Sequence, residues 1–164
     1  MTNQPITVER LRELLCYDVE TGVFTWRKAY GARCAAGSKA GSLSVRGYVY
    51  IKLTGRSYQA HRLAWLYVHG EWPKHCIDHI NGIHDDNRLS NLRDVTLSVN
   101  AQNKKKARAD NSTGLLGVTK RASGYLAQIM TQGVARKLGI YDDPTAAHAA
   151  YLEAKRQMHS GCTI

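Results

Sequence analysis

The sequence predicts an α+β protein built from two small domains joined by a polar linker. Short runs in which apolar and polar residues alternate are interspersed with short helical segments, a mixture typical of α+β folds. A chain of 164 residues is long enough for two small domains. Residues 109–113 (ADNST) form a polar stretch typical of a linker. We therefore predict one domain over residues 1–108 and a second over residues 114–164.

Composition indicates a soluble protein that binds a polyanion. Hydrophobic residues make up 43% of the chain and charged residues 22%, which supports a packed core. The formal net charge of +10 makes nucleic acid the first candidate partner. No apolar run approaches the ~18 residues of a membrane helix, and residues 1–22 lack the hydrophobic core of a signal peptide. We therefore expect a cytoplasmic protein with no membrane partner.

The first domain is expected to begin with a helix and a short strand. Residues 7–16 place Leu11, Leu14 and Leu15 on one helical face, and Thr7 precedes them as a cap. A turn at 20–22 then leads into a strand at 23–26. Residues 31–42 are rich in Gly, Ala and Ser and predict a loop.

A β-hairpin and a helix are expected next. Residues 48–53 alternate apolar and polar side chains, which predicts a half-buried strand. The sequence Thr54-Gly55-Arg56-Ser57 predicts a hairpin turn, with the return strand beginning at Tyr58. Residues 60–69 have apolar residues at helical spacing and end at Gly70, a helix stop.

The second domain is expected to contain three strands and one helix. Residues 115–122, 124–132 and 134–142 predict strands, separated by Gly-containing turns. Asp143 and Pro144 are typical of a helix start, so we predict a helix over 144–158. Its residues Ala147, Tyr151 and Ala154 fall on one side.

The densest polar region of the chain is residues 75–103. Asp78 and His79 follow the apolar Ile77 and precede Asn81-Gly82, which predicts a strand that runs into a tight turn. Asn87 and Asn91 fall in the loop that follows. Residues 97–107 predict a helix that carries Asn100 in its first two turns.

These residue types suit phosphodiester hydrolysis. A histidine accepts a proton near neutral pH, so His79 is a candidate base for a water molecule. A carboxylate and an amide oxygen are hard ligands that suit Mg²⁺ or Mn²⁺. Asp78 and Asn100 supply such a pair if the helix packs against the strand. Adjacent residues of a strand point in different directions, so His79 can face a phosphorus atom while Asp78 holds the ion.

The sequence resembles the HNH nuclease family, which has the ββα-metal fold, and in particular its phage and intron-associated homing members. The resemblance covers about residues 10–103. It rests on LLCYDVETGVFTW, AHRLAW and DHINGIHDDNRLSNLR, and on Asn100 nine residues after Asn91. It implies an α+β fold with a ββα-metal core motif at residues 75–103 and an N-terminal β-hairpin extension that precedes this motif.

The resemblance also implies a role for each residue of the motif. The histidine at the position of His79 is the general base, Asp78 and Asn100 bind one divalent ion, and Asn91 orients the loop and the histidine. Taken singly, each of these residues is better explained as part of a surface pair, a loop brace or a helix-surface residue. Taken jointly, in this order and spacing, they favour the nuclease. For His61 we favour a structural or phosphate-contacting role over catalysis.

The cysteines predict that this core has no structural zinc. Zinc-stapled members of the family carry paired cysteines around the motif, whereas Cys16, Cys34, Cys76 and Cys162 are scattered without a C-x-x-C pair. We expect free thiols and a motif held by hydrophobic packing.

Residues 114–158 resemble the plant ethylene-response-factor DNA-binding domain. The matching segments are GVTKR, GYLAQI and LGIYDDPTAAHAAY, in the order of three strands and a helix. The resemblance implies that the sheet enters the major groove of DNA. Thr119 and Met130 replace arginines of that pattern and Lys137 replaces a tryptophan, so its base preference does not transfer. The alternative is a domain that only stabilises the enzyme.

Basic and polar residues of both domains are the candidate DNA contacts. No acidic residue lies between Glu20 and Glu71, whereas basic residues recur there. In the first domain the candidates are Arg46, Lys52, Arg56, Arg62, Lys104 and Lys105. In the second domain the ethylene-response-factor resemblance implies Lys120, Arg121, Tyr125, Gln128, Arg136 and Lys137.

Taken together, the sequence predicts a metal-dependent HNH endonuclease that acts on double-stranded DNA. The resemblance implies one Mg²⁺ or Mn²⁺ ion, a nick in one strand, and 5′-phosphate and 3′-hydroxyl ends. We expect a monomer, located in the host cytoplasm if the chain is phage-encoded. The alternatives are a non-catalytic DNA-binding regulator on an HNH-like scaffold and a nuclease directed at RNA.

Overall fold

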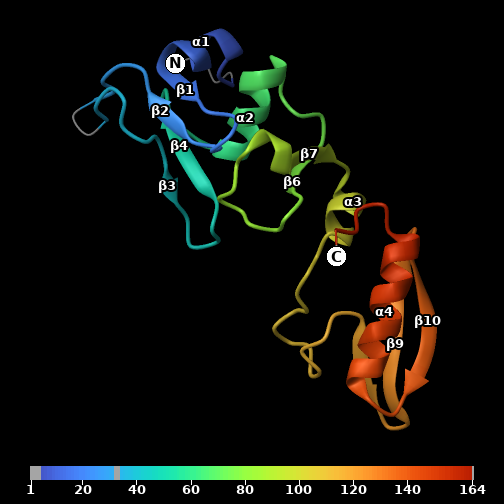
Figure 1. Ribbon diagram of the computed structural model, residues 1–164. Helices are drawn as coiled ribbons and strands as arrows, with labels where there is room; N and C mark the ends of the chain where they lie inside the picture. Colours follow the sequence, from blue (N-terminus) through green and yellow to red (C-terminus); the bar gives the residue numbers. More distant parts are fainter. Residues whose placement is uncertain (1–4, 32–33, 164) are drawn as a thin grey trace. The chain divides into compact units, whose positions relative to one another are not determined.

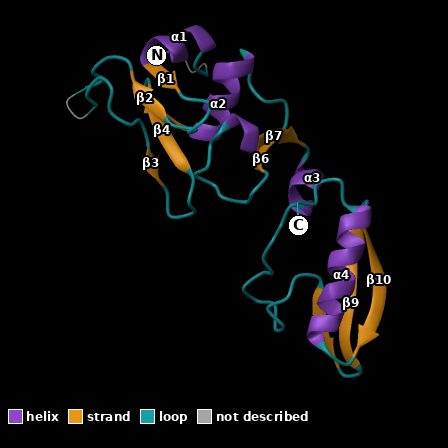
Figure 2. Cartoon of the chain, viewed as in Figure 1, coloured by secondary structure: helices purple, strands orange, loops and turns teal. Residues whose placement is uncertain are grey.

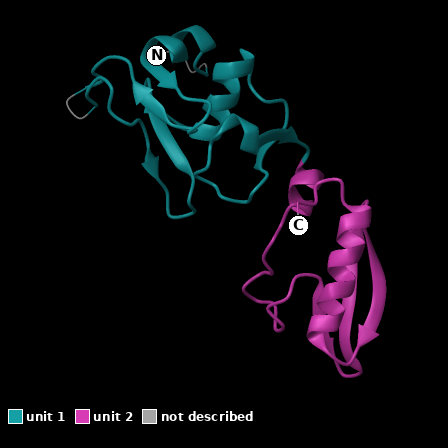
Figure 3. Ribbon diagram, in the orientation of Figure 1, with its two compact units in different colours: residues 1–96 teal, residues 97–164 magenta. Residues whose placement is uncertain are grey.

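A computed structural model describes residues 5–31 and 34–163 and divides the chain into two compact units (Figures 1 and 3). The first unit spans Met1–Thr96 and the second Leu97–Ile164. Helices and small sheets occur together, which confirms the α+β class (Figure 2). The division falls after Thr96, so residues 97–108 group with the second unit instead of with the predicted first domain. Among the described helices, none has the length and apolarity needed to cross a bilayer.

The first unit begins with α1 (Val8–Leu14), β1 (Leu15–Tyr17) and β2 (Phe24–Trp26). The Thr7 hydroxyl accepts a hydrogen bond from the Arg10 amide and caps α1, as predicted. The helix ends before residue 16 because Leu15 is extended and pairs with Trp26 across an antiparallel ladder. β1 is therefore a strand that the helical pattern concealed.

Three strands, β3 (Ser42–Leu43), β4 (Val49–Leu53) and β5 (Arg56–Gln59), form the next sheet, with β4 in the centre. Ile51 and Leu53 are buried whereas Lys52 between them is exposed, which confirms the predicted alternation. Thr54 and Gly55 both have positive φ, so the turn contains only these two residues. β3 begins at Ser42, the last residue of the predicted loop at 31–42, and residues 32–33 of that loop fall outside the described ranges.

Helix α2 (Ala60–His69) has the predicted bounds and carries much of the core of the first unit. Gly70 ends it in the left-handed conformation, with φ of 78°. The core packs α2 residues against α1 and both sheets; its fully buried members include Leu11, Leu15, Ile51, Leu53, Leu63 and Ala64.

A second hairpin follows α2. Strand β6 (Cys76–His79) pairs with β7 (Leu92–Val95) in an antiparallel ladder that sets Asp78 opposite Arg93 and His79 opposite Leu92. Residues 80–88, here called the site loop, and the short 3₁₀ helix η1 (Leu89–Asn91) connect the two strands. Ile77 and Leu92 attach this hairpin to the core.

The second unit contains α3 (Leu97–Gln102), strands β8 (Val118–Arg121), β9 (Gly124–Thr131) and β10 (Val134–Tyr141), and α4 (Pro144–Met158). Helix α3 ends five residues before its predicted end at residue 107. Beyond it, the Lys104 carbonyl accepts a hydrogen bond from the Lys155 amine, and the Gln102 side chain accepts one from the Gly161 amide. These bonds tie the segment after α3 to the end of the chain.

The three strands of the second unit form one antiparallel sheet with α4 on one face (Figure 1). Asp143 caps α4 and Pro144 is its first residue, as predicted. Ala147, Tyr151 and Ala154 are buried on the side of α4 that packs against Val118, Ala127 and Ile129. Strand β8 begins at Val118, later than predicted, because Leu115 and Leu116 pack into this core instead of extending the sheet.

Candidate active site

Strand β6 carries the two residues at the centre of the candidate site. Asp78 and His79 end the strand with exposed fractions of 6% and 3%. Because neighbouring residues of a strand project to opposite sides, their side chains take part in different networks. Such burial is costly for groups that carry charge, so each needs defined partners.

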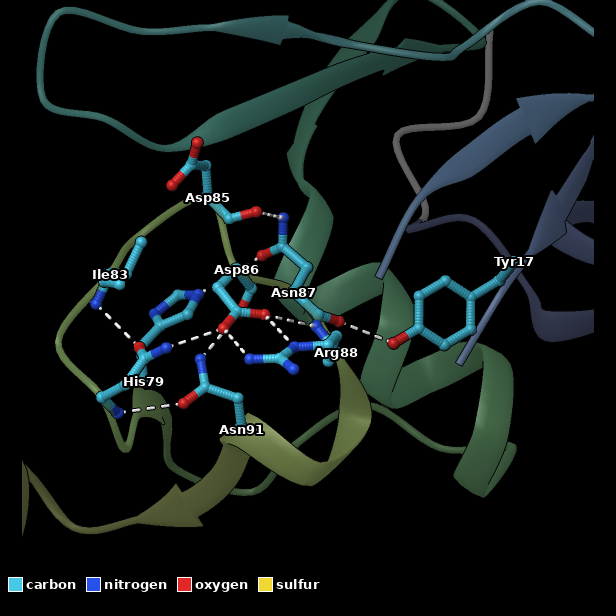
Figure 4. Close-up of polar contacts among 9 residues, drawn as sticks. Tyr17, His79, Ile83, Asp85, Asp86, Asn87, Arg88 and Asn91 are labelled. Carbon is cyan, nitrogen blue, oxygen red and sulfur yellow. Dashed lines mark hydrogen bonds and ion pairs between the residues drawn. The ribbon is translucent and has the colours of Figure 1, made fainter. Parts of the chain in front are cut away.

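The ring of His79 is oriented by Asn87. Its Nε2 lies 3.3 Å from the Asn87 Oδ1 (Figure 4). The amide of Asn87 donates through Nδ2 to the Asp85 carbonyl, which leaves Oδ1 to face the imidazole as an acceptor. The Nε2 atom must then carry the proton, so the lone pair of the neutral ring resides on Nδ1. Burial is the main cause that lowers the pKa of His79, which favours the neutral form.

Asp78 is paired with Arg93 across the hairpin. Both Nε and Nη2 of Arg93 donate to Oδ2 of Asp78, at 2.9 and 2.8 Å. The cross-strand register produces this pair, since the two residues lie directly opposite one another. A carboxylate held in place in this way offers oxygen ligands that suit a divalent cation.

Asn91 braces the site loop. Its Oδ1 accepts from the Asn81 amide at 2.9 Å, and its Nδ2 donates to the Asp86 carbonyl at 2.8 Å (Figure 4). Asp86 also accepts from the Asn81 side chain and pairs with Arg88. The hydrogen bond from Arg88 is the largest cause that lowers the pKa of Asp86 to about 2. These bonds shape the loop that presents Asn87.

Three further aromatic rings surround His79. The centroid of His61 lies 4.9 Å away with the rings edge to face, that of His84 lies 5.9 Å away, and that of Tyr48 lies 6.1 Å away. His61 is 4% exposed, and its Nδ1 has no hydrogen-bond partner among the described residues. Burial is the main cause that lowers the pKa of His61 to about 3. This neutral ring packs against His79, which fits a structural role.

The second predicted metal ligand belongs to the other compact unit. Asn100 lies on α3 and is partly buried. The structure describes each unit by itself, so the pairing of Asn100 with Asp78 stays a prediction. Among the described residues, no group of three His, Cys, Asp or Glu is arranged to hold a metal ion. A site built from one carboxylate and one amide oxygen is of a different kind.

The candidate DNA contacts of the first unit differ in exposure. Arg46 and Lys52 are exposed, whereas Arg56 and Arg62 are partly buried. The Arg62 guanidinium donates to the His75 carbonyl and lies over the Trp72 ring at 5.9 Å. Arg62 therefore has a packing role as well as a charge.

The strand register of the second unit sorts its candidate contacts between two faces. Residues that pair across antiparallel strands share a face. Lys137 pairs with Gln128, and Arg121 pairs with Gly124, four residues earlier in β9. The even spacing puts the side chains of Lys137, Gln128 and Arg121 on the face away from α4. Lys120, Tyr125 and Arg136 have the opposite parity, and Tyr125 packs against the Val118–Ala127–Ala147 cluster. Lys104 and Lys105 are exposed just after α3.

The segment that builds this site corresponds to a known protein family. Residues 58–102 match the model of the HNH endonuclease family. This HNH segment runs from β5 through α3 and contains Asp78, His79, Asn91 and Asn100. No curated protein and no solved structure matches the chain. The HNH match supports nuclease activity, and the role of His79 stays a prediction. The ethylene-response-factor resemblance of residues 114–158 stays a prediction.

Two polar residues of the HNH segment had no assigned role in the sequence analysis. Asn87 contacts the imidazole of His79, and Arg93 neutralises Asp78. The strand register would have indicated Arg93, since it lies opposite Asp78. Asn87 gives no such signal, because only the folded loop brings its side chain to His79.

Proposed function

We propose that the protein is a metal-dependent DNA endonuclease that hydrolyses phosphodiester bonds at His79. The observation that carries the proposal is a buried, neutral imidazole whose Nε2 is held by Asn87, within a segment that matches the HNH endonuclease model. In this tautomer Nδ1 carries the lone pair, so Nδ1 is the atom that would take a proton from the water molecule that attacks phosphorus.

Asp78 and Asn100 are the residues that would hold a divalent cation. The donor set of one carboxylate and one amide oxygen fits Mg²⁺ or Mn²⁺, which prefer oxygen ligands and retain several waters. A bound cation of this kind stabilises the negative charge that develops on the phosphate and on the departing 3′ oxygen. Arg93 holds the Asp78 carboxylate in place through Oδ2 and offsets its charge within the buried hairpin.

DNA binding is proposed for the basic surfaces of both units. Arg46 and Lys52 are exposed on the first unit, and Arg121, Gln128 and Lys137 lie on the face of the second sheet that α4 leaves uncovered. Contacts of Lys and Arg with phosphates give affinity without sequence preference. A monomer with one site is expected to nick one strand of a duplex.

Cleavage of supercoiled plasmid tests the proposal. With Mg²⁺ or Mn²⁺, the wild type should convert supercoiled plasmid to open circles, whereas His79→Ala should not. His69→Ala is the matched control, because His69 is an exposed histidine on α2 whose ring lies against that of Trp65. A wild type that binds DNA without cutting it in either metal would identify the chain as a DNA-binding regulator.

The products and the substrate class are tested in the same assay. Open circles should accumulate before linear DNA, and DNA ligase should reseal them, because ligase requires 5′-phosphate and 3′-hydroxyl ends. Duplex DNA should be cut in preference to RNA of the same sequence. Faster cleavage of RNA would replace DNA by RNA as the substrate and would leave the role of His79 unchanged.

A further inference from the structure

A second histidine, His84, lies beside His79 and takes no part in the proposed mechanism. The two ring centroids are 5.9 Å apart, and His84 is exposed whereas His79 is buried. We propose that the imidazole of His84 binds a phosphate of the DNA strand that is cut, adjacent to the phosphate that is attacked. This inference rests on the proposed function, because it assigns His84 to the substrate of the same site.

The orientation of the His84 ring is fixed on two sides. Its ring stacks on that of Tyr48, with centroids 4.1 Å apart and an angle of 8° between the planes. Its Nδ1 lies 3.0 Å from the carbonyl oxygen of Arg46. A carbonyl only accepts hydrogen bonds, so Nδ1 carries a proton. The atom that remains for a ligand is Nε2, on the far side of the ring.

The Nε2 atom of His84 has no hydrogen-bond partner in the described parts of the chain. When the ring carries a second proton, on Nε2, it is a cation that donates from this atom, and a phosphate oxygen is a strong acceptor for such a charged donor. Arg46, whose carbonyl holds the ring, contributes an exposed cation from the same segment. On the site loop, Asp86 is already paired with Arg88, which leaves Asp85 as the neighbouring carboxylate.

The distance between the two histidines supports a shared substrate. Rings with centroids 5.9 Å apart reach groups that are close together along one DNA strand. Tyr48 links them, since its ring lies 4.1 Å from His84 and 6.1 Å from His79. The stack on Tyr48 thus places Nε2 of His84 at a set position relative to the buried imidazole of His79.

A purely structural role for His84 makes a different prediction. The stack on Tyr48 and the bond to Arg46 also join the site loop to residues 44–48, and this clamp does not require Nε2. His84→Asn retains an amide nitrogen near the position of Nδ1 but has no atom at Nε2. His84→Arg presents a cation to a phosphate but loses the imidazole that bonds to Arg46. The two variants therefore separate phosphate binding from loop clamping.

The first measurement is the affinity for duplex DNA in EDTA, which needs no cleavage. Phosphate binding predicts that His84→Ala and His84→Asn each weaken binding about tenfold, in line with the loss of one charge-assisted hydrogen bond. His84→Arg should stay within about threefold of the wild type. His69→Ala is the control, since this exposed histidine also lies against an aromatic ring, that of Trp65, with centroids 4.1 Å apart. Thermal unfolding of each variant fixes a temperature at which all are folded.

The second measurement locates the contact. A methylphosphonate removes the charge of one phosphate. A series of duplexes, each with a single methylphosphonate at a different position, therefore tests every phosphate in turn. One position should weaken binding by the wild type and have no further effect on His84→Asn. Affinity of His84→Asn equal to that of the wild type, or additive effects at every position, would overturn the inference. Failure of the wild type to cut DNA would instead overturn the proposed function, and the two failures are distinguishable.

Discussion

At the scale of the residue, the protonation state of His79 is set by its neighbours. Burial disfavours the imidazolium, and the Asn87 Oδ1 holds the proton of the neutral ring on Nε2. The adjacent Asp78 is neutralised by a cross-strand arginine instead of by the histidine. The proposed base and the proposed cation ligand are thus adjacent in the chain, and each contacts a different neighbour, Asn87 for His79 and Arg93 for Asp78.

Replacing Asn87 by Ala tests the orientation of the base. Loss of Oδ1 frees the ring to change tautomer, so cleavage should fall on the order of tenfold to a hundredfold, as for other partners that orient a functional histidine. DNA affinity in EDTA should not change. Tyr17→Phe is the comparison, because it removes only the hydrogen bond to the Asn87 backbone carbonyl and keeps Oδ1, so its loss of cleavage should be smaller. Unchanged cleavage by Asn87→Ala would refute this role.

His61 predicts a loss of stability in acid. Its pKa is about 3 in the folded chain because of burial, against ~6.5 when unfolded. Between these values the unfolded state binds one more proton, so stability decreases as the pH falls, by about 1.4 kcal/mol per pH unit. Urea unfolding at pH 7 and pH 5 should show a smaller acid loss for His61→Phe than for the wild type. Equal losses of stability in the wild type and in His61→Phe would contradict a lowered pKa of His61.

At the scale of the element, the site loop depends on the β1–β2 hairpin. The Tyr17 hydroxyl at the end of β1 donates to the Asn87 carbonyl at 2.6 Å. Gly22, in the turn between β1 and β2, has a φ of 71° and lies against the backbone of Asn87 and Arg88. The N-terminal hairpin therefore supports the residue that orients the base.

Gly22→Ala tests this support. A Cβ at residue 22 would meet the Arg88 nitrogen and the Asn87 carbonyl carbon, so the site loop must move. Gly55→Ala is the matched control, since Gly55 has a φ of 84° but nothing within 4 Å of its Cβ position. The control should lose about 1 kcal/mol in urea unfolding from the φ strain alone, and Gly22→Ala ~2 kcal/mol more, together with cleavage. Equal effects would mean that the contact is unimportant.

At the scale of the whole molecule, the chain divides inside the HNH segment. The boundary after Thr96 leaves Asp78 and His79 in the first unit and Asn100 in the second. Residues next to α3 bond to the end of the chain, through Gly161 with Gln102 and through Lys155 with Lys104. The second unit therefore carries one ligand of the proposed metal site, Asn100, as well as proposed DNA contacts.

Deletion of residues 112–164 should consequently lower the cleavage rate as well as the affinity for DNA. The truncated chain loses the partners of Gln102 and Lys104, so the segment that carries Asn100 loses its support. We expect weaker DNA binding and, even at saturating DNA, a cleavage rate at least about tenfold lower. Circular dichroism checks that the first unit stays folded. A truncated protein that cuts saturating DNA at the full rate would show that the second unit only binds.

The two faces of the second sheet make a further prediction. If the face away from α4 binds DNA, Arg121→Ala and Lys137→Ala should each weaken binding. Each should also reduce, by about 1, the magnitude of the slope of the logarithm of the binding constant against the logarithm of the salt concentration. Arg136→Ala, on the opposite face, should do less. Fluorescence anisotropy across a salt series measures both quantities. An equal effect of all three would argue for contacts that do not follow the sheet.

How far the sequence predicted this protein depends on the range of the interactions. Helix α2, the caps at Thr7 and Asp143, and the buried side of α4 were predicted correctly, because caps and periodicity act within a few residues. Strand β1 was missed because its apolar residues continue the helical pattern of α1. Helix α3 was predicted too long because the segment after it bonds to residues far along the chain.

The sequence alone determined most of the elements, the excess of positive charge and the residues of the motif around His79, since these depend on local residue types and their spacing. Only the tertiary structure decided that Asn87 orients the imidazole, that Arg93 neutralises Asp78, and that Tyr48 and His84 stack beside the base. Such contacts join residues that are distant in sequence. They arise when a core formed by other residues fixes loops and strands against one another, and no local pattern records them.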